Sequence, residues 1–378
     1  MKLFKSLLIA PATLGLLAPL PSISSEIDFQ SISKYSNAEY EIDSNTFNYS
    51  PTNNTLLSGG EGLVESSSSD SFSSTTTASF SAEAILGGVS SDLDVSEAVS
   101  FDYQYQIGLT SSFTGEDTLS VTIDAAGPND GSTGLPTNSE ASAYFGMDTT
   151  NDALVVDGIT YTFPVGGSTM MVGDSTDISA LYTGACAYSG FSDYMGDCGT
   201  GNSIGLGGAT SGAAVAASYA FDGGFSIAGG VSSPTNELVG GGTDLFGVEA
   251  AYTADDYAVS VAFSDQELST YIGVNGYYTF DFATISAGYE SEDIDDADSA
   301  SAFFVGLTKE IGAGTAELGY ASSDMSTAFD TSGLTSYAYE LSYAYPVNDA
   351  LTITPGIGIV DTDAGETTTA AIKASFSF

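Results

Sequence analysis

One segment, residues 173–211, concentrates the side chains that could do chemistry. It contains four aspartates and both cysteines of the chain: Asp174, Asp177, Asp193, Asp197, Cys186 and Cys198. In an exported protein, two cysteines that lie close in sequence most simply form a disulfide that closes a small loop. Such a bond would contribute about 2–3 kcal/mol by restricting the unfolded chain. The alternatives are free thiols or thiolate metal ligands, although a zinc site normally takes four ligands.

The four aspartates allow two hypotheses. They are either solvated loop charges, like the acidic residues elsewhere in the chain, or carboxylates that attract cations at the narrowest point of a passage. A ring of carboxylates selects cations because a narrow passage through a low-dielectric wall focuses the electric field.

Composition excludes most other chemistry. The 378 residues include no His and no Arg, which excludes Ser-His-Asp, Cys-His and His-ligated metal sites. Five Lys against 49 acidic residues, a net charge of −44, exclude nucleic-acid binding. Two acidic segments, 292–298 and 361–366, lack the ligand spacing of an EF-hand and are expected to be solvated loops. We therefore predict no enzyme activity, no catalytic residue, no cofactor and no metal site.

The stretch Val99–Leu109 predicts the kind of element that positions these side chains. It has the sequence V-S-F-D-Y-Q-Y-Q-I-G-L, in which apolar residues occupy every second position. Because successive strand side chains face opposite sides, this is a strand with one apolar and one polar face. Its length, about eleven residues, is what a tilted strand needs to cross the hydrocarbon core of a bilayer. A strand of a water-soluble sandwich would alternate too, but would usually be shorter.

Alternation of this kind recurs down the chain. We predict sixteen strands, at 77–88, 98–110, 117–125, 153–163, 168–173, 212–221, 224–231, 244–253, 257–264, 270–280, 282–289, 300–310, 314–322, 336–346, 350–360 and 367–378. The connections alternate between tight turns and longer loops, as in barrels with short periplasmic turns. A further candidate strand, 141–147, would break this alternation, so we place it within a long loop, 126–152. The predicted fold is all-β, a transmembrane antiparallel β-barrel of sixteen strands.

The two ends of the chain indicate export and assembly. Residues 1–24 are a predicted signal peptide, in which Lys2 and Lys5 precede an apolar stretch interrupted by prolines. Residues 25–76 are a predicted flexible acidic lead-in, and 77–378 the barrel, with an inward loop at 173–211. The terminal aromatic Phe378 resembles the signal that outer-membrane barrels present to the assembly machinery. In the last strand, Lys373 shares a face with Ser375 and is expected to point into the lumen.

Two segments carry a resemblance to a known family. Val99–Ile123, with S-F-T-G-E-D-T-L at its turn, resembles the first hairpins of cyanobacterial outer-membrane porins of the iron-uptake type, within the carbohydrate-selective porin superfamily. Ile159–Val165, I-T-Y-T-F-P-V, is similar to the fourth strand of that family. The resemblance implies a sixteen-stranded channel, usually a homotrimer, that passes small solutes or inorganic ions. Relatives typically carry a surface-layer-homology domain and a coiled coil before the barrel, and this chain shows neither pattern.

The resemblance also gives the loop 173–211 a role. In general porins the third outer loop folds inward and narrows the channel, which makes Asp174, Asp177, Asp193 and Asp197 the candidate constriction. We therefore predict a porin of the outer membrane, surrounded by lipid, that lets small hydrophilic solutes and ions diffuse and favours cations. A surface adhesin or autotransporter barrel is the alternative, although its passenger would need to be longer than the lead-in here. A barrel protease or lipase normally relies on His, which the chain lacks.

Overall fold

A computed structural model describes residues 75–92, 99–127, 145, 150–204, 212–233, 238, 245–266, 269–295, 298–325, 336–362 and 365–377. All of them belong to the second of two compact units, Gly62–Phe378. The predicted signal peptide, the lead-in apart from Thr75 and Thr76, and the terminal Phe378 lie outside the described residues. Among the residues described, no helix is both long and apolar enough to cross a membrane.

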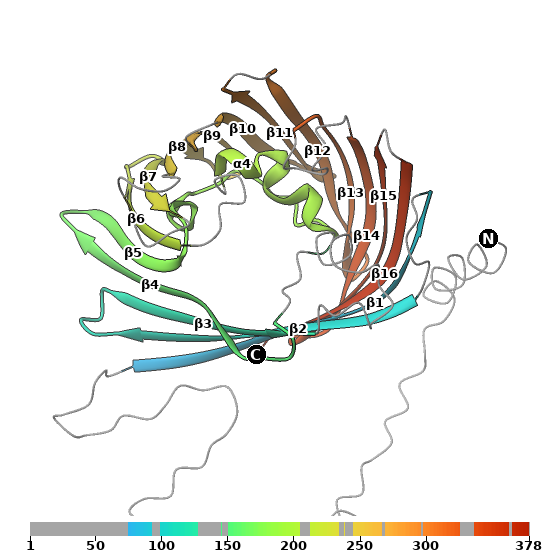
Figure 1. Ribbon diagram of the computed structural model, residues 1–378, viewed down its shortest axis with the longest axis horizontal. Helices are drawn as coiled ribbons and strands as arrows, with labels where there is room; N and C mark the ends of the chain where they lie inside the picture. Colours follow the sequence, from blue (N-terminus) through green and yellow to red (C-terminus); the bar gives the residue numbers. More distant parts are fainter. Residues whose placement is uncertain are drawn as a thin grey trace, which may run out of the picture. The chain divides into compact units, whose positions relative to one another are not determined.

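In the described part of the chain, sixteen antiparallel strands form a closed barrel, because β1 pairs with both β2 and β16 (Figure 1). The strands are β1 (Thr75–Ser91), β2 (Val99–Ser112), β3 (Thr118–Ala126), β4 (Val155–Val165), β5 (Ser168–Thr176), β6 (Gly212–Ala220), β7 (Phe225–Ser233), β8 (Leu245–Thr253), β9 (Tyr257–Asp265), β10 (Ser269–Phe280), β11 (Ala283–Ile294), β12 (Ala300–Ile311), β13 (Gly314–Ser323), β14 (Ser336–Asn348), β15 (Leu351–Thr362) and β16 (Gly365–Ser377). Each strand pairs with its neighbour in sequence. The predicted sixteen-stranded β-barrel is confirmed.

The two faces of the barrel wall differ as the alternation predicts. On β8, Phe246 and Val248 are exposed on the outer face, whereas Gly247 and Glu249 are buried on the inner face. On β2, Phe101 is 58% exposed outward, and Gln104 faces inward, where it contacts Glu83 of β1. A register shift of one residue would exchange the faces of a whole strand, so this pattern determines the pairing register.

Aromatic side chains form an arc on the outer face, at the end of the barrel that carries the short turns. Neighbouring rings have centroids 4.5 to 6.2 Å apart along the series Phe225, Tyr252, Tyr257, Tyr278, Phe280 and Phe282. These residues belong to β7 to β10 and the turn that follows. Amphipathic rings at one level suit the boundary between apolar and polar surroundings.

Several strands are longer than the sequence predicts, and in β11 and β5 the extension replaces residues that were expected to lie in a loop. β11 continues to Ile294, whereas the acidic run after Tyr289 was expected to be loop. The strand continues because Glu290 and Glu292 face inward, and their carboxylates accept hydrogen bonds from Ser203 and Tyr271. β5 continues to Thr176 through an irregularity after Gly173, so the loop that follows begins at Asp177 and not at 173.

The turn between β2 and β3 is built around one buried carboxylate. Asp117 is 4% exposed and accepts hydrogen bonds from the backbone N–H of Phe113 and Thr114 and from the hydroxyls of Ser112, Thr114 and Tyr161. Burial acts to raise the pKa of Asp117, but these hydrogen bonds outweigh it and hold the pKa well below its usual range. The ionised carboxylate therefore fixes the geometry of this turn.

Replacing Asp117 should weaken the barrel in a pH-dependent manner. A group with a lowered folded-state pKa stabilises the fold above its unfolded pKa, about 3.9, and loses that contribution as pH falls further. We expect Asp117→Asn to lower the urea midpoint of unfolding in detergent at pH 7, with a smaller difference from wild type below about pH 4. The matched control is Glu116→Gln, because Glu116 is exposed in the same turn. Equal midpoints for wild type and Asp117→Asn at pH 7 would contradict this account.

Candidate functional site

The connection between β5 and β6 lies against the inner wall of the barrel. Its described residues, 177–204, form two 3₁₀ helices and one α-helical turn: η2 (Ile178–Leu181), η3 (Asp193–Gly199) and α4 (Gly201–Ile204). η2 contacts β6 and β7, η3 contacts β11 to β13, and α4 contacts β8 to β10. In Figure 1 this green segment lies within the ring of strands. We call residues 177–204 the inward loop.

The outgoing arm of the inward loop is held by carboxylates of the wall. Glu249 of β8 accepts the N–H groups of Thr183 and Gly184, at 2.7 and 2.9 Å. Farther along, Glu317 of β13 accepts both the N–H and the hydroxyl of Ser189. The arm thus follows the wall from β8 toward β14.

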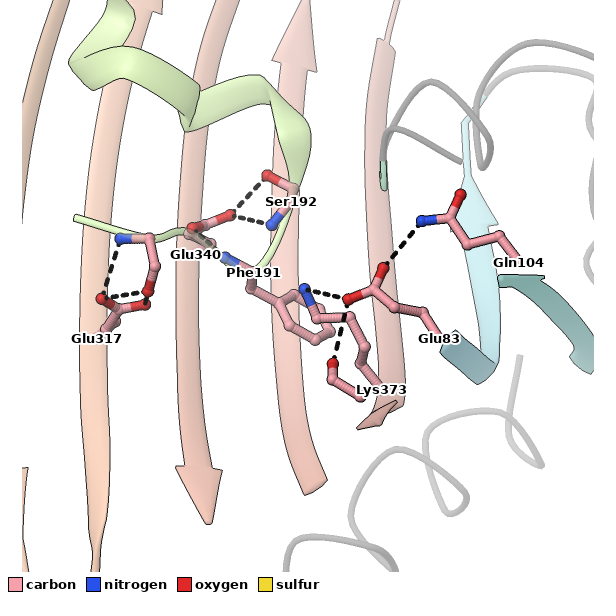
Figure 2. Close-up of polar contacts among 9 residues, drawn as sticks. Glu83, Gln104, Phe191, Ser192, Glu317, Glu340 and Lys373 are labelled. Carbon is pink, nitrogen blue, oxygen red and sulfur yellow. Dashed lines mark hydrogen bonds and ion pairs between the residues drawn. The ribbon is translucent and has the colours of Figure 1, made fainter. Parts of the chain in front are cut away.

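Glu340 of β14 holds the tip of the loop (Figure 2). Its Oε1 accepts the N–H of Phe191 at 2.8 Å and the hydroxyl of Tyr188 at 2.7 Å. Its Oε2 accepts the N–H and the hydroxyl of Ser192, at 3.1 and 2.6 Å. One side chain of the wall therefore satisfies four donors of the loop.

The return arm uses the same kind of contact. The N–H of Ser203 donates to Glu290 of β11, and the side-chain amide of Asn275 on β10 donates to the hydroxyl of Thr200. Glu290 is fully buried, and the other three glutamates that hold the loop are 3 to 6% exposed. We call these four residues the anchoring glutamates: Glu249, Glu290, Glu317 and Glu340.

These contacts solve the main difficulty of placing irregular chain inside a barrel. A loop has backbone N–H groups that its own residues do not satisfy, and burying such a group without a partner is costly. A hydrogen bond to a charged acceptor contributes about 1.5–3 kcal/mol, more than a bond between neutral groups. The inward glutamates therefore fix the path of the loop.

Glycines on the inner face leave room for the loop. Five of them, on five strands, stand where an added Cβ would collide with loop atoms: Gly273 with Ser203, Gly288 with the carbonyl of Cys198, Gly306 with Tyr188, Gly319 with Met195 and Gly356 with Phe191. The apolar residues Tyr188, Phe191 and Met195 are each 6% exposed or less, and they pack with Phe304 of the wall. The loop is therefore in close contact with the wall along most of its length.

Cys186 and Cys198 lie close together, one on each arm of the loop. Their Cα atoms are 5.7 Å apart, within the range that a disulfide requires. Three successive residues with positive φ, Asp197, Cys198 and Gly199, turn the chain at the end of η3. This turn brings the return arm back alongside the outgoing arm.

The structure distributes the four predicted aspartates among different environments. Asp174 lies in β5 opposite Ile159, which is exposed on the outer face, so it does not face the lumen. Asp177 caps η2 by accepting the N–H of Ser179, Asp193 begins η3, and Asp197 is exposed within the turn that ends it. They do not form one cluster.

Burial, followed by the charges of Glu249 and Asp177, raises the pKa of Tyr182.

The wall beyond the tip of the loop carries a second polar group of residues, which we call the Glu83 patch. Glu83 of β1 accepts hydrogen bonds from Gln104 of β2 and Ser375 of β16, both at 3.1 Å. The ammonium of Lys373 lies 4.0 Å from the same carboxylate. Figure 2 shows how these side chains lie on the wall. Of the two lysines in the described residues, Lys373 faces inward as predicted, and Lys309 is exposed on β12.

Sequence reasoning did not identify the anchoring glutamates. A signal for three of them was present, because an inward Gly stands two positions away: Gly247-x-Glu249, Gly288-x-Glu290 and Glu317-x-Gly319. A gap beside an acceptor on one strand face is what a docked backbone needs. Glu340 has no such neighbour, and its role follows only from the position of the loop.

No protein-family model matches the sequence, and no curated protein matches it. The barrel is similar to solved bacterial outer-membrane proteins. OprB of Pseudomonas putida has a TM-score of 0.58 at 13% identity, covering 80% of this chain and 94% of that one. An anion-selective porin from Comamonas acidovorans has a TM-score of 0.55 at 14% identity, covering 80% of this chain and 100% of that one. OmpT of Vibrio cholerae, in its trimer form, gives 0.55 and 14%, covering 80% and 99%.

The chain is therefore a closed sixteen-stranded barrel whose fold is similar to that of bacterial outer-membrane porins. At identities this low, the similarity defines the fold alone.

The glycine contacts lead to a prediction about the loop. Gly288→Val should push the return arm off the wall, since the added side chain would meet the backbone of Cys198. We expect faster hydrogen–deuterium exchange of the amides in residues 183–203, because lost hydrogen bonds expose those N–H groups. Ala287→Val is the matched control, because Ala287 is the exposed, outward neighbour on the same strand. Unchanged loop protection in Gly288→Val would show that the glycine is not needed for docking.

Proposed function

We propose that this protein is a porin of the outer membrane, a passive water-filled channel for small hydrophilic solutes and inorganic ions that favours cations. The observation that carries the proposal is the inward loop, a segment of the chain fixed inside a closed barrel by contacts with the wall. A loop in this position narrows the passage through the barrel. The similarity to known porins in fold supports the same function.

The outer face supports placement in a membrane. Residues such as Phe246, Val274 and Leu341 are exposed there although they are apolar, and the aromatic arc lies at the end with the short turns. In transmembrane barrels the short turns are periplasmic, and aromatic girdles flank an apolar band. Outer-membrane lipid is accordingly the proposed surrounding.

The preference for cations rests on the charges of the inner face. In the described residues, Glu83, Asp102 and the anchoring glutamates face inward, and Lys373 is the inward cation. Asp177, Asp193 and Asp197 lie in the loop and add to the negative potential, whereas Asp174 would act only near the mouth. Such a lumen concentrates cations and depletes anions.

Finer assignments are also part of the proposal. The resemblance of Val99–Ile123 favours the cyanobacterial iron-uptake type of porin and assembly as a homotrimer, as one similar structure is a trimer form. A cleaved signal peptide at 1–24 would direct export, and Phe378 would serve the barrel assembly machinery.

Reversal potentials test the function. In planar bilayers with a KCl gradient, we expect discrete single-channel currents and a zero-current potential that is positive on the dilute side, as for a cation-selective pore. The potential of the lumen should amount to several kT at low salt and be screened as salt rises. A purified, folded protein without channel activity would contradict the porin, and a reversed sign would contradict only the cation preference.

The disulfide is proposed on the proximity of Cys186 and Cys198 and has its own test. Mass spectrometry of unreduced peptides should detect one cross-link between the two. Cys186→Ser should lower the free energy of unfolding by about 2–3 kcal/mol, since a loop of this length then gains entropy when unfolded. Reduced wild type serves as the control and should match the variant. Two alkylatable thiols in the native protein would rule the bond out.

A further inference from the structure

Five acidic residues of the inner face fall into two groups by what their carboxylates contact. Glu249, Glu290, Glu317 and Glu340 are 0 to 6% exposed and accept hydrogen bonds from the inward loop. Glu83 differs, because its side chain is 28% exposed and its hydrogen-bond partners, Gln104 and Ser375, belong to the wall itself. Ions in the lumen can therefore approach Glu83 more closely than they can approach the anchoring glutamates.

Glu83 lies beside the tip of the inward loop. Phe191 fills the space above Gly356 on β15, and Gly356 pairs with Ala371 on β16. Ala371 is two residues, one inward position, before Lys373, which lies within 4.0 Å of Glu83. Figure 2 shows the Phe191 ring between the Glu340 contacts and the Lys373–Glu83 pair. The part of the wall that carries Glu83 is therefore next to the part that the tip of the loop covers.

The contacts around Glu83 hold its charge in place without burying it. Gln104 donates to Oε2, and Ser375 donates to Oε1, so both carboxylate oxygens are fixed from neighbouring strands. Lys373 is 21% exposed and 4.0 Å away, at the outer limit of an ion pair. Two charges in a partly solvated site at that distance do not cancel for an ion that passes on the side of the carboxylate.

We propose that Glu83 is the residue that determines ion selectivity, with Lys373 tuning it, and that its ligand is a passing hydrated cation. This inference rests on the proposed channel function and deepens it. The four aspartates of the sequence prediction contribute to the potential at the mouth and along the loop, and Glu83 acts at the narrow part. Charges at a narrow place keep their influence in high salt, where the Debye length is about 3 Å at 1 M, whereas charges at the rim lose theirs.

Charge-neutralising variants separate these contributions. A change of about one kT in local potential alters the ratio of cations to anions about sevenfold, because the two concentrations change by opposite Boltzmann factors. In 1 M against 0.1 M KCl, we expect Glu83→Gln to lower the cation-to-anion permeability ratio by roughly threefold or more, and Lys373→Gln to raise it. The double variant should lie between the two. Heat-modifiable gel mobility would confirm that each variant is folded.

The control is Glu366→Gln, which removes one charge from the exposed end of β16, the strand that carries Lys373. Its permeability ratio should equal that of wild type. A conducting Glu83→Gln channel with the wild-type ratio would overturn the inference and leave the porin intact. If Glu83→Gln does not fold, an unchanged ratio in Lys373→Gln overturns the inference in its place. A wild type without currents would instead overturn the porin function.

Discussion

The structure depends on one interaction, the acceptance of loop N–H groups by glutamates on the inner face of the barrel. A closed barrel satisfies the backbone of its strands, but it offers nothing to a loop that enters the lumen. Glu249, Glu290, Glu317 and Glu340 provide that missing partner, on four different strands. The position of the loop, and with it the shape of the passage, follows from where these side chains stand.

This interaction shows that part of the acidic composition has a structural role. A net charge of −44 indicates a strongly negative protein, yet several of the acidic residues on the inner face are engaged with the loop. They hold the loop in place, and because they are buried, loop atoms lie between their carboxylates and the lumen. Glu83 shows the opposite arrangement, since polar neighbours fix its carboxylate but leave it accessible. Glutamates of the inner face therefore differ in what they contact: four hold the loop, and Glu83 stays accessible from the lumen.

The loop can pack closely against the wall because the inner face has glycines beneath it. Gly288, Gly306 and Gly319 sit beneath the loop on three adjacent strands, and their absence of a Cβ lets Tyr188, Met195 and Cys198 approach the wall. Glycine weakens a strand, both by entropy and by the lack of a side chain to pack. The close packing of the loop offsets that cost, so the barrel and the loop stabilise each other.

The sequence by itself determined the barrel. Alternation is a local property of each strand, and all sixteen strands and the direction of Lys373 follow from it. Only the tertiary structure decided which acidic residues meet the loop, because a carboxylate that faces the lumen has the same pattern whether it meets ions or backbone. Asp174 was predicted to lie in the loop, but it belongs to β5, which continues to Thr176, and it faces outward. The local sequence does not show where the strand ends, so this position could not be predicted from it. Contacts between residues far apart in sequence, such as Ser192 with Glu340, become visible only once the strands are closed into a ring.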